Sequence, residues 1–369
     1  PTGDSTKRIW FMDDGSFLNF TYVGSNTFTP DQGYAEYRLY NWTTGEYSLT
    51  HRDGWTQWFN STGLLLNFTN AEGYAITLTY TSGILSAITD SSGRSLQITV
   101  ANNHIIQIKD DLNRLWTYSY STDGFLTKVT DPLGNVRYYE YDSSTGYLTS
   151  YLLPSGQNYL FEYDVVGRVR AVYFQMVNMT TKTDLAAFRL YSIYYGSGMT
   201  SVFDALNAKT TVYFDSSSRV TTITDALGNN ISRSWTSAYQ LSTLTDALGA
   251  SFTFNYDTRG NLIYLRDPTG NETKFGYEFT DDKRICLNLL VNTTNARGYT
   301  TYYYYYPNSR LLKNETDPTG NATQYTYANG FLDTLTDPCG GFYDFTYDAY
   351  GQLTNLIAPE GVTYSYQYD

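Results

Sequence analysis

The feature that most constrains this chain is internal repetition: a turn signal returns about every 20 to 22 residues along nearly its whole length. The clearest copies read Asp-Pro-x-Gly-Asn, as in Asp131–Asn135 and Asp267–Asn271. In such a segment the Asp side chain caps the turn, Pro presets φ, and Gly adopts a positive φ. We call this element the Asp-Gly turn. Further copies begin at Asp225, Asp246, Asp317 and Asp337.

A second turn motif, Tyr-Asp-x-x-Gly-x-Leu, falls halfway between successive Asp-Gly turns. We call it the Tyr-Asp turn, and its full copies begin at Tyr256 and Tyr347. Between the two kinds of turn lie stretches of about five to eight residues in which apolar and polar side chains alternate, which predicts strands. Each period is therefore a β-hairpin. We expect a single array over residues 1–369, with about sixteen hairpins of about 21 residues each.

Composition supports an all-β fold, because 17% of the residues are aromatic and 39 are Tyr, a residue enriched in strands. A lone hairpin is marginally stable in water, so each must pair with its neighbours in one continuous antiparallel sheet. Strand twist then winds the sheet into a spiral tube or shell, a β-solenoid. Tyr302 and Tyr303 should face opposite sides and stack between hairpins. Two irregular stretches, at about 173–200 and 278–299, should be longer hairpins that project beyond the others.

The alternation of Tyr-Asp-x-x-Gly-x-Leu with Thr-Asp-Pro-x-Gly-Asn resembles the YD repeat of the Rhs family, which is found in bacterial polymorphic toxins, insecticidal toxin-complex shells and animal teneurins. The match runs from about Asp13 onward and is best after Asp90. The resemblance implies a hollow cocoon that encloses a toxin, or a cell-surface ectodomain. The sequence departs from the toxin pattern, because we find no closing core segment, no self-cleavage aspartates in a recognisable context and no non-repetitive toxin tail.

Several function classes are disfavoured. A net charge of −12 and a basic run no longer than Lys283-Arg284 argue against a nucleic-acid partner. No apolar stretch approaches the roughly 18 residues that a membrane-spanning helix needs. The only histidines, His51 and His104, lie near no nucleophile or metal motif, so we expect no enzyme.

The turn carboxylates offer the hard oxygen ligands that Ca²⁺ prefers. They are Asp131, Asp225, Asp267 and Asp317. A self-capped turn already accounts for each of them, and the calcium-loop repeat Gly-Gly-x-Gly-x-Asp is absent. We therefore expect no cofactor, with Ca²⁺ as the less favoured alternative.

The two cysteines cannot form a disulfide framework or a four-cysteine metal site. Cys339 lies in a predicted turn and Cys286 in a predicted strand, and the sequence leaves open whether they pair or remain free and mostly buried. The chain begins at Pro1 without Met and stops at Asp369 inside a repeat, so we expect a segment truncated at both ends.

Asn-x-Ser/Thr sequons are more frequent than composition predicts, which favours N-glycosylation and a secreted or cell-surface protein. Asn41 and Asn60 take the Asp position of Tyr-Asp turns, Asn271 and Asn321 follow a turn Gly, and Asn178 and Asn292 lie in the irregular stretches, so we expect these six in surface loops. The sequons are Asn19, Asn41, Asn60, Asn67, Asn178, Asn230, Asn271, Asn292, Asn314 and Asn321.

Three hypotheses follow for function. The first is a glycosylated structural tube that stacks head to tail into a filament or sheath, because Tyr368-Asp369 followed by Pro1-Thr-Gly3 would complete a Tyr-Asp turn. The second is part of a Rhs-type cocoon that encloses a toxin. The third is a teneurin-like adhesion or carbohydrate-binding ectodomain, which would need a patch of exposed aromatic residues.

Overall fold

The computed structural model describes residues 6–12, 16–30, 37–42, 44–51, 53–70, 73–178, 183–282, 285–307, 309–348 and 351–368. In this part of the chain strands follow one another with turns between them, and the one helical element is the 3-10 turn η1 (Pro359–Gly361). The strands are β1 (Lys7–Phe11), β2 (Phe17–Gly24), β3 (Thr27–Pro30), β4 (Tyr37–Asn41), β5 (Tyr47–His51), β6 (Thr56–Phe59), β7 (Leu65–Thr69), β8 (Ala75–Thr81), β9 (Ile84–Asp90), β10 (Ser95–Ala101), β11 (His104–Asp110), β12 (Leu115–Tyr120), β13 (Leu126–Thr130), β14 (Val136–Tyr141), β15 (Leu148–Leu152), β16 (Gln157–Tyr163), β17 (Val169–Asn178), β18 (Thr183–Asp184), β19 (Phe188–Gly196), β20 (Met199–Phe203), β21 (Lys209–Phe214), β22 (Val220–Thr224), β23 (Asn230–Trp235), β24 (Leu241–Thr245), β25 (Ser251–Tyr256), β26 (Leu262–Arg266), β27 (Glu272–Asp282), β28 (Ile285–Thr294), β29 (Thr300–Tyr305), β30 (Leu312–Thr316), β31 (Ala322–Ala328), β32 (Phe331–Thr336), β33 (Phe342–Tyr347), β34 (Leu353–Ile357) and β35 (Thr363–Ser365).

These elements form one sheet in which each strand pairs antiparallel with the next along the chain. The short β18 departs from this order, because it pairs only with the end of β17, which pairs onward with β19. No helix in the described residues is long and apolar enough to span a bilayer. The predicted all-β fold, a single continuous antiparallel sheet built from hairpins, is confirmed.

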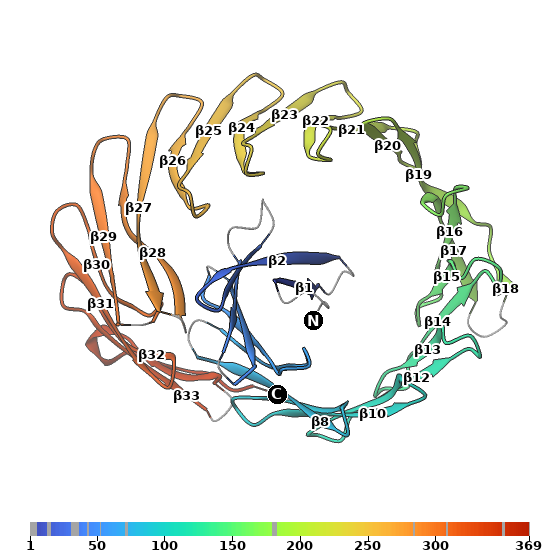
Figure 1. The fold of residues 1–369 in the computed structure, drawn as a ribbon, viewed down its shortest axis with the longest axis horizontal. Helices are drawn as coiled ribbons and strands as arrows, with labels where there is room; N and C mark the ends of the chain where they lie inside the picture. Colours follow the sequence, from blue (N-terminus) through green and yellow to red (C-terminus); the bar gives the residue numbers. More distant parts are fainter. Residues whose placement is uncertain are drawn as a thin grey trace.

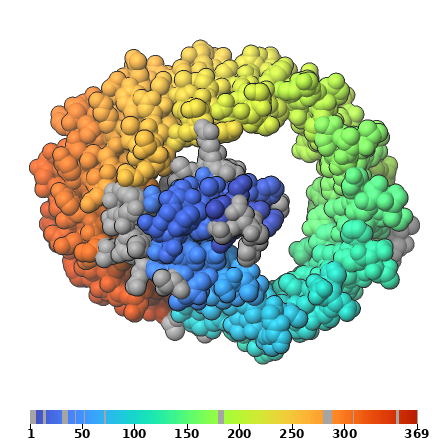
Figure 2. All heavy atoms as spheres, viewed as in Figure 1, coloured from blue at the N-terminus to red at the C-terminus, as the bar shows by residue number. Residues whose placement is uncertain are grey.

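The sheet winds into a ring with an open interior. Figure 1 shows the strands from β8 to β33 following one another around this ring, with β1 and β2 inside it. The two ends of the ring meet at a cavity of about 790 Å³, lined by Tyr74 and Ser92 from the beginning of the ring and by Phe331 and Tyr347 from its end. Figure 2 shows the N-terminal segment filling one side of the opening, with empty space between it and the opposite wall.

The N-terminal strands enclose the main buried core of the described chain. Leu18, Phe20, Phe28, Leu39 and Leu49 form this cluster, and Phe20 and Leu49 have no exposed surface. The strands β1–β7 curl inward and pack around this cluster, which the repeat pattern alone does not predict. Their alternating pattern is the same as that of the wall strands, so periodicity alone could not distinguish the two.

The two faces of the sheet differ in chemistry throughout. Antiparallel pairing keeps the side chains of one face together from strand to strand. One face, here called the aromatic face, carries pairs such as Tyr151↔Tyr159, and the core of β1–β7 lies on it. The other, the polar face, carries pairs such as Ser232↔Thr245. The names describe the majority on each face, since the polar face also carries apolar pairs such as Met199↔Tyr213.

Aromatic side chains stack between strands as predicted. Along the aromatic face, successive rings of Tyr139, Tyr151, Tyr159, Phe174 and Phe188 lie 5.2, 6.4, 5.7 and 5.1 Å apart between centroids. Such spacings fall within the range of favourable aromatic pairs. The series crosses five neighbouring strands, from β14 to β19, and joins adjacent hairpins through their side chains.

Both irregular stretches form extended hairpins, as expected. The strands β27 and β28 pair as far as Asp282↔Ile285, and β28 also contacts the N-terminal strand β5. In the other stretch β17 lengthens to Asn178 and pairs there with β18. The β27–β28 hairpin thus connects the wall with the segment inside the ring.

Candidate functional site: the repeated turns and the contacts between hairpins

The Asp-Gly turn is a three-residue hairpin loop closed by backbone and side-chain hydrogen bonds. The backbone N–H of Gly270 donates to the carbonyl of Asp267 at 3.0 Å, and the N–H of Asp267 donates to the carbonyl of Asn271 at 2.9 Å. Oδ1 of Asp267 accepts from the N–H groups of Thr269 and Asn271 at 2.9 and 2.8 Å. Gly270 has φ +91°, so the loop is a type I turn followed by a left-handed glycine.

The Tyr-Asp turn uses the same design at the opposite rim of the wall. The N–H of Gly167 donates to the carbonyl of Asp164 at 3.1 Å, and the N–H of Asp164 donates to the carbonyl of Arg168 at 2.8 Å. Asn113 and Asn207, which replace glycine in other turns, have φ +61° and +62°. Asn, which tolerates this conformation better than most residues that have a side chain, thus takes the left-handed position in these turns.

The residue after the turn glycine completes the cap, a role that the sequence analysis missed. Nδ2 of Asn271 donates to Oδ2 of Asp267 at 2.9 Å, and Nε of Arg94 donates to Oδ2 of Asp90 at 2.7 Å. In the sequence this contact corresponds to an Asp that is followed four residues later by Asn or Arg. The same bond is made by Asn135, Asn229, Asn261, Asn321, Arg114, Arg168 and Arg219.

Hydrogen bonds within the turns favour the ionised carboxylates. The Asn271 amide and the Thr269 hydroxyl lower the pKa of Asp267 from 3.8 to about 2. The Thr319 hydroxyl and the Asn321 amide lower the pKa of Asp317 to about 2 in the same way. Both carboxylate oxygens thus serve the turn itself.

The calcium alternative gains no support from this geometry. Side-chain amides of the turn also lower the pKa of Asp131 and Asp225, so all four proposed ligands share the same arrangement. Nowhere in the described ranges do three His, Cys, Asp or Glu side chains gather as a metal site.

The tyrosine of each Tyr-Asp turn connects one hairpin with the preceding one. The hydroxyl of Tyr163 donates to the backbone carbonyl of Leu148, fifteen residues earlier, at 2.8 Å. Leu148 follows the glycine of the preceding Tyr-Asp turn by two residues, so the Tyr and Leu positions of the motif meet across hairpins. The same contact joins Tyr80 to Leu65, Tyr120 to Ile105, Tyr305 to Leu290, Tyr368 to Leu353 and, through the indole N–H, Trp235 to Val220.

A ring from one hairpin also covers the turn of the next. The Phe331 ring stacks on Tyr347 with centroids 5.1 Å apart. It lies so near Gly351 that an added Cβ would be 2.5 Å from the ring. Phe125 has the same relation to Tyr141 and Gly146. The turn glycine is therefore required at these positions for two reasons, its positive φ and the ring packed against it.

The sequons fall into two environments. Asn178, Asn230, Asn271 and Asn321 are exposed, whereas the others are half-buried. Asn60 opens a turn, and Oδ1 of Asn60 accepts from the N–H of Leu64 at 2.9 Å. The expected surface-loop position is wrong for Asn292, which pairs with Gly276 inside the extended hairpin. Asn41 and Asn178 are likewise the last residues of strands β4 and β17 rather than loop residues.

The histidines and cysteines occupy structural positions. His51 stacks on Trp55 with centroids 5.1 Å apart, and His104 packs on Tyr120 at 4.4 Å. Cys339 lies in a turn as predicted, but its thiol is free and exposed, so the alternatives of pairing and burial are both wrong for it. It occupies the third turn position, which points away from the wall. The side chain of Cys286 lies outside the described residues.

Comparisons with known proteins agree with this architecture. The sequence profile described as Teneurin YD-shell matches residues 47–248 and 237–369. No curated protein matches the sequence. A Photorhabdus luminescens Tc holotoxin pore with a mutation in TccC3 is 12% identical, with a TM-score of 0.41 over 95% of this chain and 26% of that chain. The TcdB2-TccC3 structure without the hypervariable C-terminal region is 12% identical, with a TM-score of 0.47 over 97% of this chain and 22% of that chain.

This chain thus spans about a quarter of the length of those solved structures. The profile match covers both kinds of turn and most of the ring, so the resemblance of these turns to YD repeats is confirmed. The turns, the sheet and the profile match all indicate a structural, shell-forming role. The chain belongs to the Teneurin YD-shell family.

Proposed function

We propose that this chain is part of the wall of a secreted or cell-surface YD shell whose hollow interior encloses a cargo. The observation that carries the proposal is the circular course of the sheet, whose last hairpins return to the beginning of the ring and leave an open interior (Figure 2). A wall one strand thick gives enclosure with few residues. Its stability is then a sum of contacts between neighbouring hairpins.

The aromatic face is proposed to line the interior. The core of β1–β7 lies on this face, where the sheet is most tightly curled. The chain winds in one direction from these strands through the ring (Figure 1), which keeps the same face on the concave side. The polar face, with its Ser, Thr and Asn side chains, then meets solvent outside.

Site-selective labelling tests this orientation. In a background with Cys286→Ser and Cys339→Ser, the neighbours Asn255→Cys on the polar face and Phe254→Cys on the aromatic face form a matched pair. A small maleimide should label both thiols, whereas a large polyethylene glycol maleimide should label Asn255→Cys much faster. Equal rates with the large reagent would show that the aromatic face does not line an enclosed space.

Glycosylation of the outer face is part of the proposal. Asn19, Asn67, Asn230, Asn292 and Asn314 all fall on the polar face by register. Glycans on Asn230, Asn292 and Asn314, which lie in strands of the ring, would cover the outside of the wall and leave the interior free. They would also discourage pairing between walls of different molecules.

The filament hypothesis stays a prediction that this geometry favours less than the shell. Stacking by strand pairing would require β35 of one copy to reach β1 of the next. In Figure 1 β1 lies inside the ring, whereas β35 continues the outer wall through its pairing with β34. Electron microscopy distinguishes the two: we expect separate hollow particles, and tubes with a regular axial repeat would instead establish stacking.

Adhesion remains a second candidate because of two tyrosines. Tyr302 and Tyr304 lie on the polar face and are 46% and 52% exposed. Aromatic rings at an exposed surface commonly contact sugars or partner proteins. If the outer wall is adhesive, the double variant Tyr302→Ser and Tyr304→Ser should lose glycan-array or cell-binding signal. A wild-type protein without such signal would remove this candidate.

A further inference from the structure

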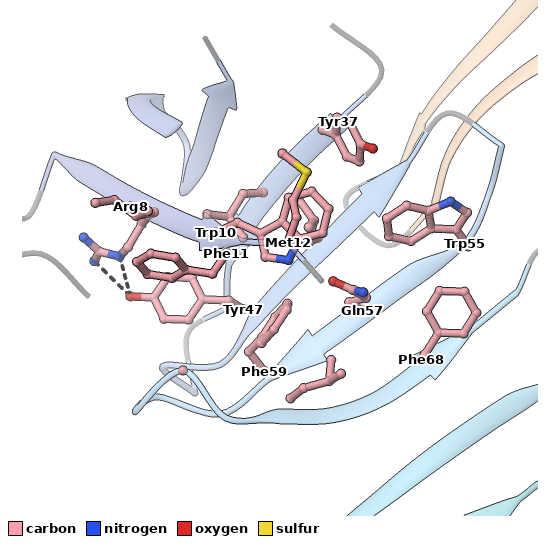
Figure 3. A pocket seen from close by; sticks show the side chains of 15 residues that line it. Arg8, Trp10, Phe11, Met12, Tyr37, Tyr47, Trp55, Gln57, Phe59 and Phe68 are labelled. Carbon is pink, nitrogen blue, oxygen red and sulfur yellow. Dashed lines mark hydrogen bonds between the residues drawn. The ribbon is translucent and has the colours of Figure 1, made fainter. Parts of the chain in front are cut away.

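The N-terminal strands inside the ring contain a cavity that wall building does not explain. Its volume is about 590 Å³, which is within the range of small-molecule sites. Side chains of β1 and of β4 to β7 line it (Figure 3). The cavity lies on the aromatic face, beside the core cluster of these strands.

One side of the cavity is a series of aromatic rings. Trp10 and Tyr37 lie 5.3 Å apart between centroids, Tyr37 and Trp55 5.9 Å, and Trp55 and Phe68 5.6 Å. These residues come from four different segments of the fold, so the series depends on the inward curl of the sheet. Such a wall presents ring faces and edges suited to another planar ring.

Gln57 places a side-chain amide in this largely apolar lining. Gln57 is the polar member of the cross-strand row Leu39, Leu49, Gln57 and Phe68. Its Oε1 is buried and has no hydrogen-bond partner. Buried acceptors in native proteins nearly always have a donor, so this atom calls for one. Figure 3 shows Gln57 among the aromatic side chains of the cavity.

The positively charged residue of the lining is held in place by internal contacts. Arg8, the charged residue of the lining, donates from Nε and from Nη2 to the hydroxyl of Tyr47 at 3.1 and 2.9 Å. Its guanidinium also lies over the Phe28 ring, 5.1 Å from the centroid. These contacts with a hydroxyl group and an aromatic ring hold the guanidinium in place without neutralising its positive charge.

We propose that this cavity binds a planar ring compound that carries one hydrogen-bond donor, an N–H or O–H that bonds to Oε1 of Gln57. The rings of Trp10, Tyr37, Trp55 and Phe68 supply the apolar contacts. The Gln57 amide fixes the orientation of the ligand and selects for the donor. This activity is independent of the shell role, because it resides in β1–β7 rather than in the ring.

Paired probes test the proposal on the full chain. The probes are 2-naphthol, which has a donor, and 2-methoxynaphthalene, which has the same rings and none. In calorimetric titration the wild-type protein should bind 2-naphthol about 2- to 10-fold more tightly, the range expected for one hydrogen bond. In Gln57→Leu this preference should disappear while binding of 2-methoxynaphthalene is kept or improved. The matched control Gln107→Leu, in wall strand β11, should retain the preference.

Two outcomes would overturn the proposal. One is a wild-type protein that binds neither probe at concentrations up to their solubility. The other is equal affinity for both probes, which would leave only an apolar cavity without donor selection. Because the wild-type ratio decides by itself, the test holds even if Gln57→Leu fails to fold.

Discussion

The hydroxyl of Tyr163 lies 2.8 Å from the backbone carbonyl oxygen of Leu148, and this bond joins two Tyr-Asp turns that are one repeat apart. The Tyr147 ring packs on Tyr163 from the same side, with centroids 4.8 Å apart. A backbone acceptor and an aromatic neighbour thus explain why the first position of the motif is Tyr. Phe would keep the ring contact and lose the hydrogen bond.

Tyr163→Phe should therefore weaken the junction between neighbouring hairpins by about 1 kcal/mol, since a half-buried carbonyl loses its donor. Repeat structures open locally, so the effect should appear as faster amide hydrogen exchange in β15 and β16. Tyr159→Phe is the matched control, because Tyr159 lies in the same strand and stacks through its ring. Equal exchange in both variants would contradict a role for the Tyr163 hydroxyl.

The two kinds of turn glycine should differ in their tolerance of a side chain. Gly249→Ala meets open space, so its cost is the positive φ alone, about 1–2 kcal/mol. Gly351→Ala has the same backbone strain and in addition places Cβ against the Phe331 ring, which adds about 1–3 kcal/mol. Denaturant unfolding of both variants measures the difference. Equal destabilisation would show that the ring moves away at no cost.

The turns were the most predictable part of this fold, because their chemistry is local. Asn113 and Asn207 could be assigned to the left-handed position from residue type and period alone, and both are found there. The bond between Tyr163 and Leu148 could not be predicted, because it depends on how successive hairpins stack in space. The period identifies both residues but gives no distance between them.

The inward curl of β1–β7 was also beyond reach of the sequence. Phe20 and Leu49 alternate with polar residues in the same way as residues of the wall, and only the curl of the N-terminal strands onto one another makes them a core. Asn292 was misplaced for a related reason. A sequon suggests a loop, but the extended hairpin continues its strand pairing past this residue.

Stability should depend on pH through the turn carboxylates. The folded pKa values of Asp142, Asp267 and Asp317 are about 2, below the ordinary 3.8, so folding favours the ionised form. Their contribution is present above about pH 4 and is lost as the pH falls from about 4 to about 2. The melting temperature should drop across this window, and the drop should be smaller in Asp317→Asn.

Asp123→Asn is the control for this effect. In this turn Ser121 takes the first position, where the capping carboxylate lies in other turns, and Asp123 takes the third. This variant should keep the full pH dependence of the parent. If Asp317→Asn retained it as well, the hydrogen bonds of the turn would not be the source.

The last prediction concerns which sequons carry glycans in material from the native host. Both N–H groups of the Asn321 side chain are used in its turn, since Nδ2 donates to Oδ2 of Asp317 at 3.0 Å and to Oγ1 of Thr319 at 2.6 Å. A glycan on Nδ2 would replace one of these hydrogens and weaken the cap. Asn230 is exposed on the polar face, and Thr224 contacts its Oδ1 rather than Nδ2. Asn41 lies on the aromatic face, and its Oδ1 is buried.

Glycopeptide mapping should consequently find high occupancy at Asn230, lower occupancy at Asn271 and Asn321, and the lowest at Asn41. Because sugars are added while the chain is still folding, the rate at which each turn closes decides the competition. The variant Asp317→Ala removes one acceptor of the Asn321 amide and should raise occupancy at that residue alone. High occupancy at Asn41 would contradict the assignment of the aromatic face to the interior, and a bare polypeptide mass would remove glycosylation from the proposed function while leaving the shell itself untouched.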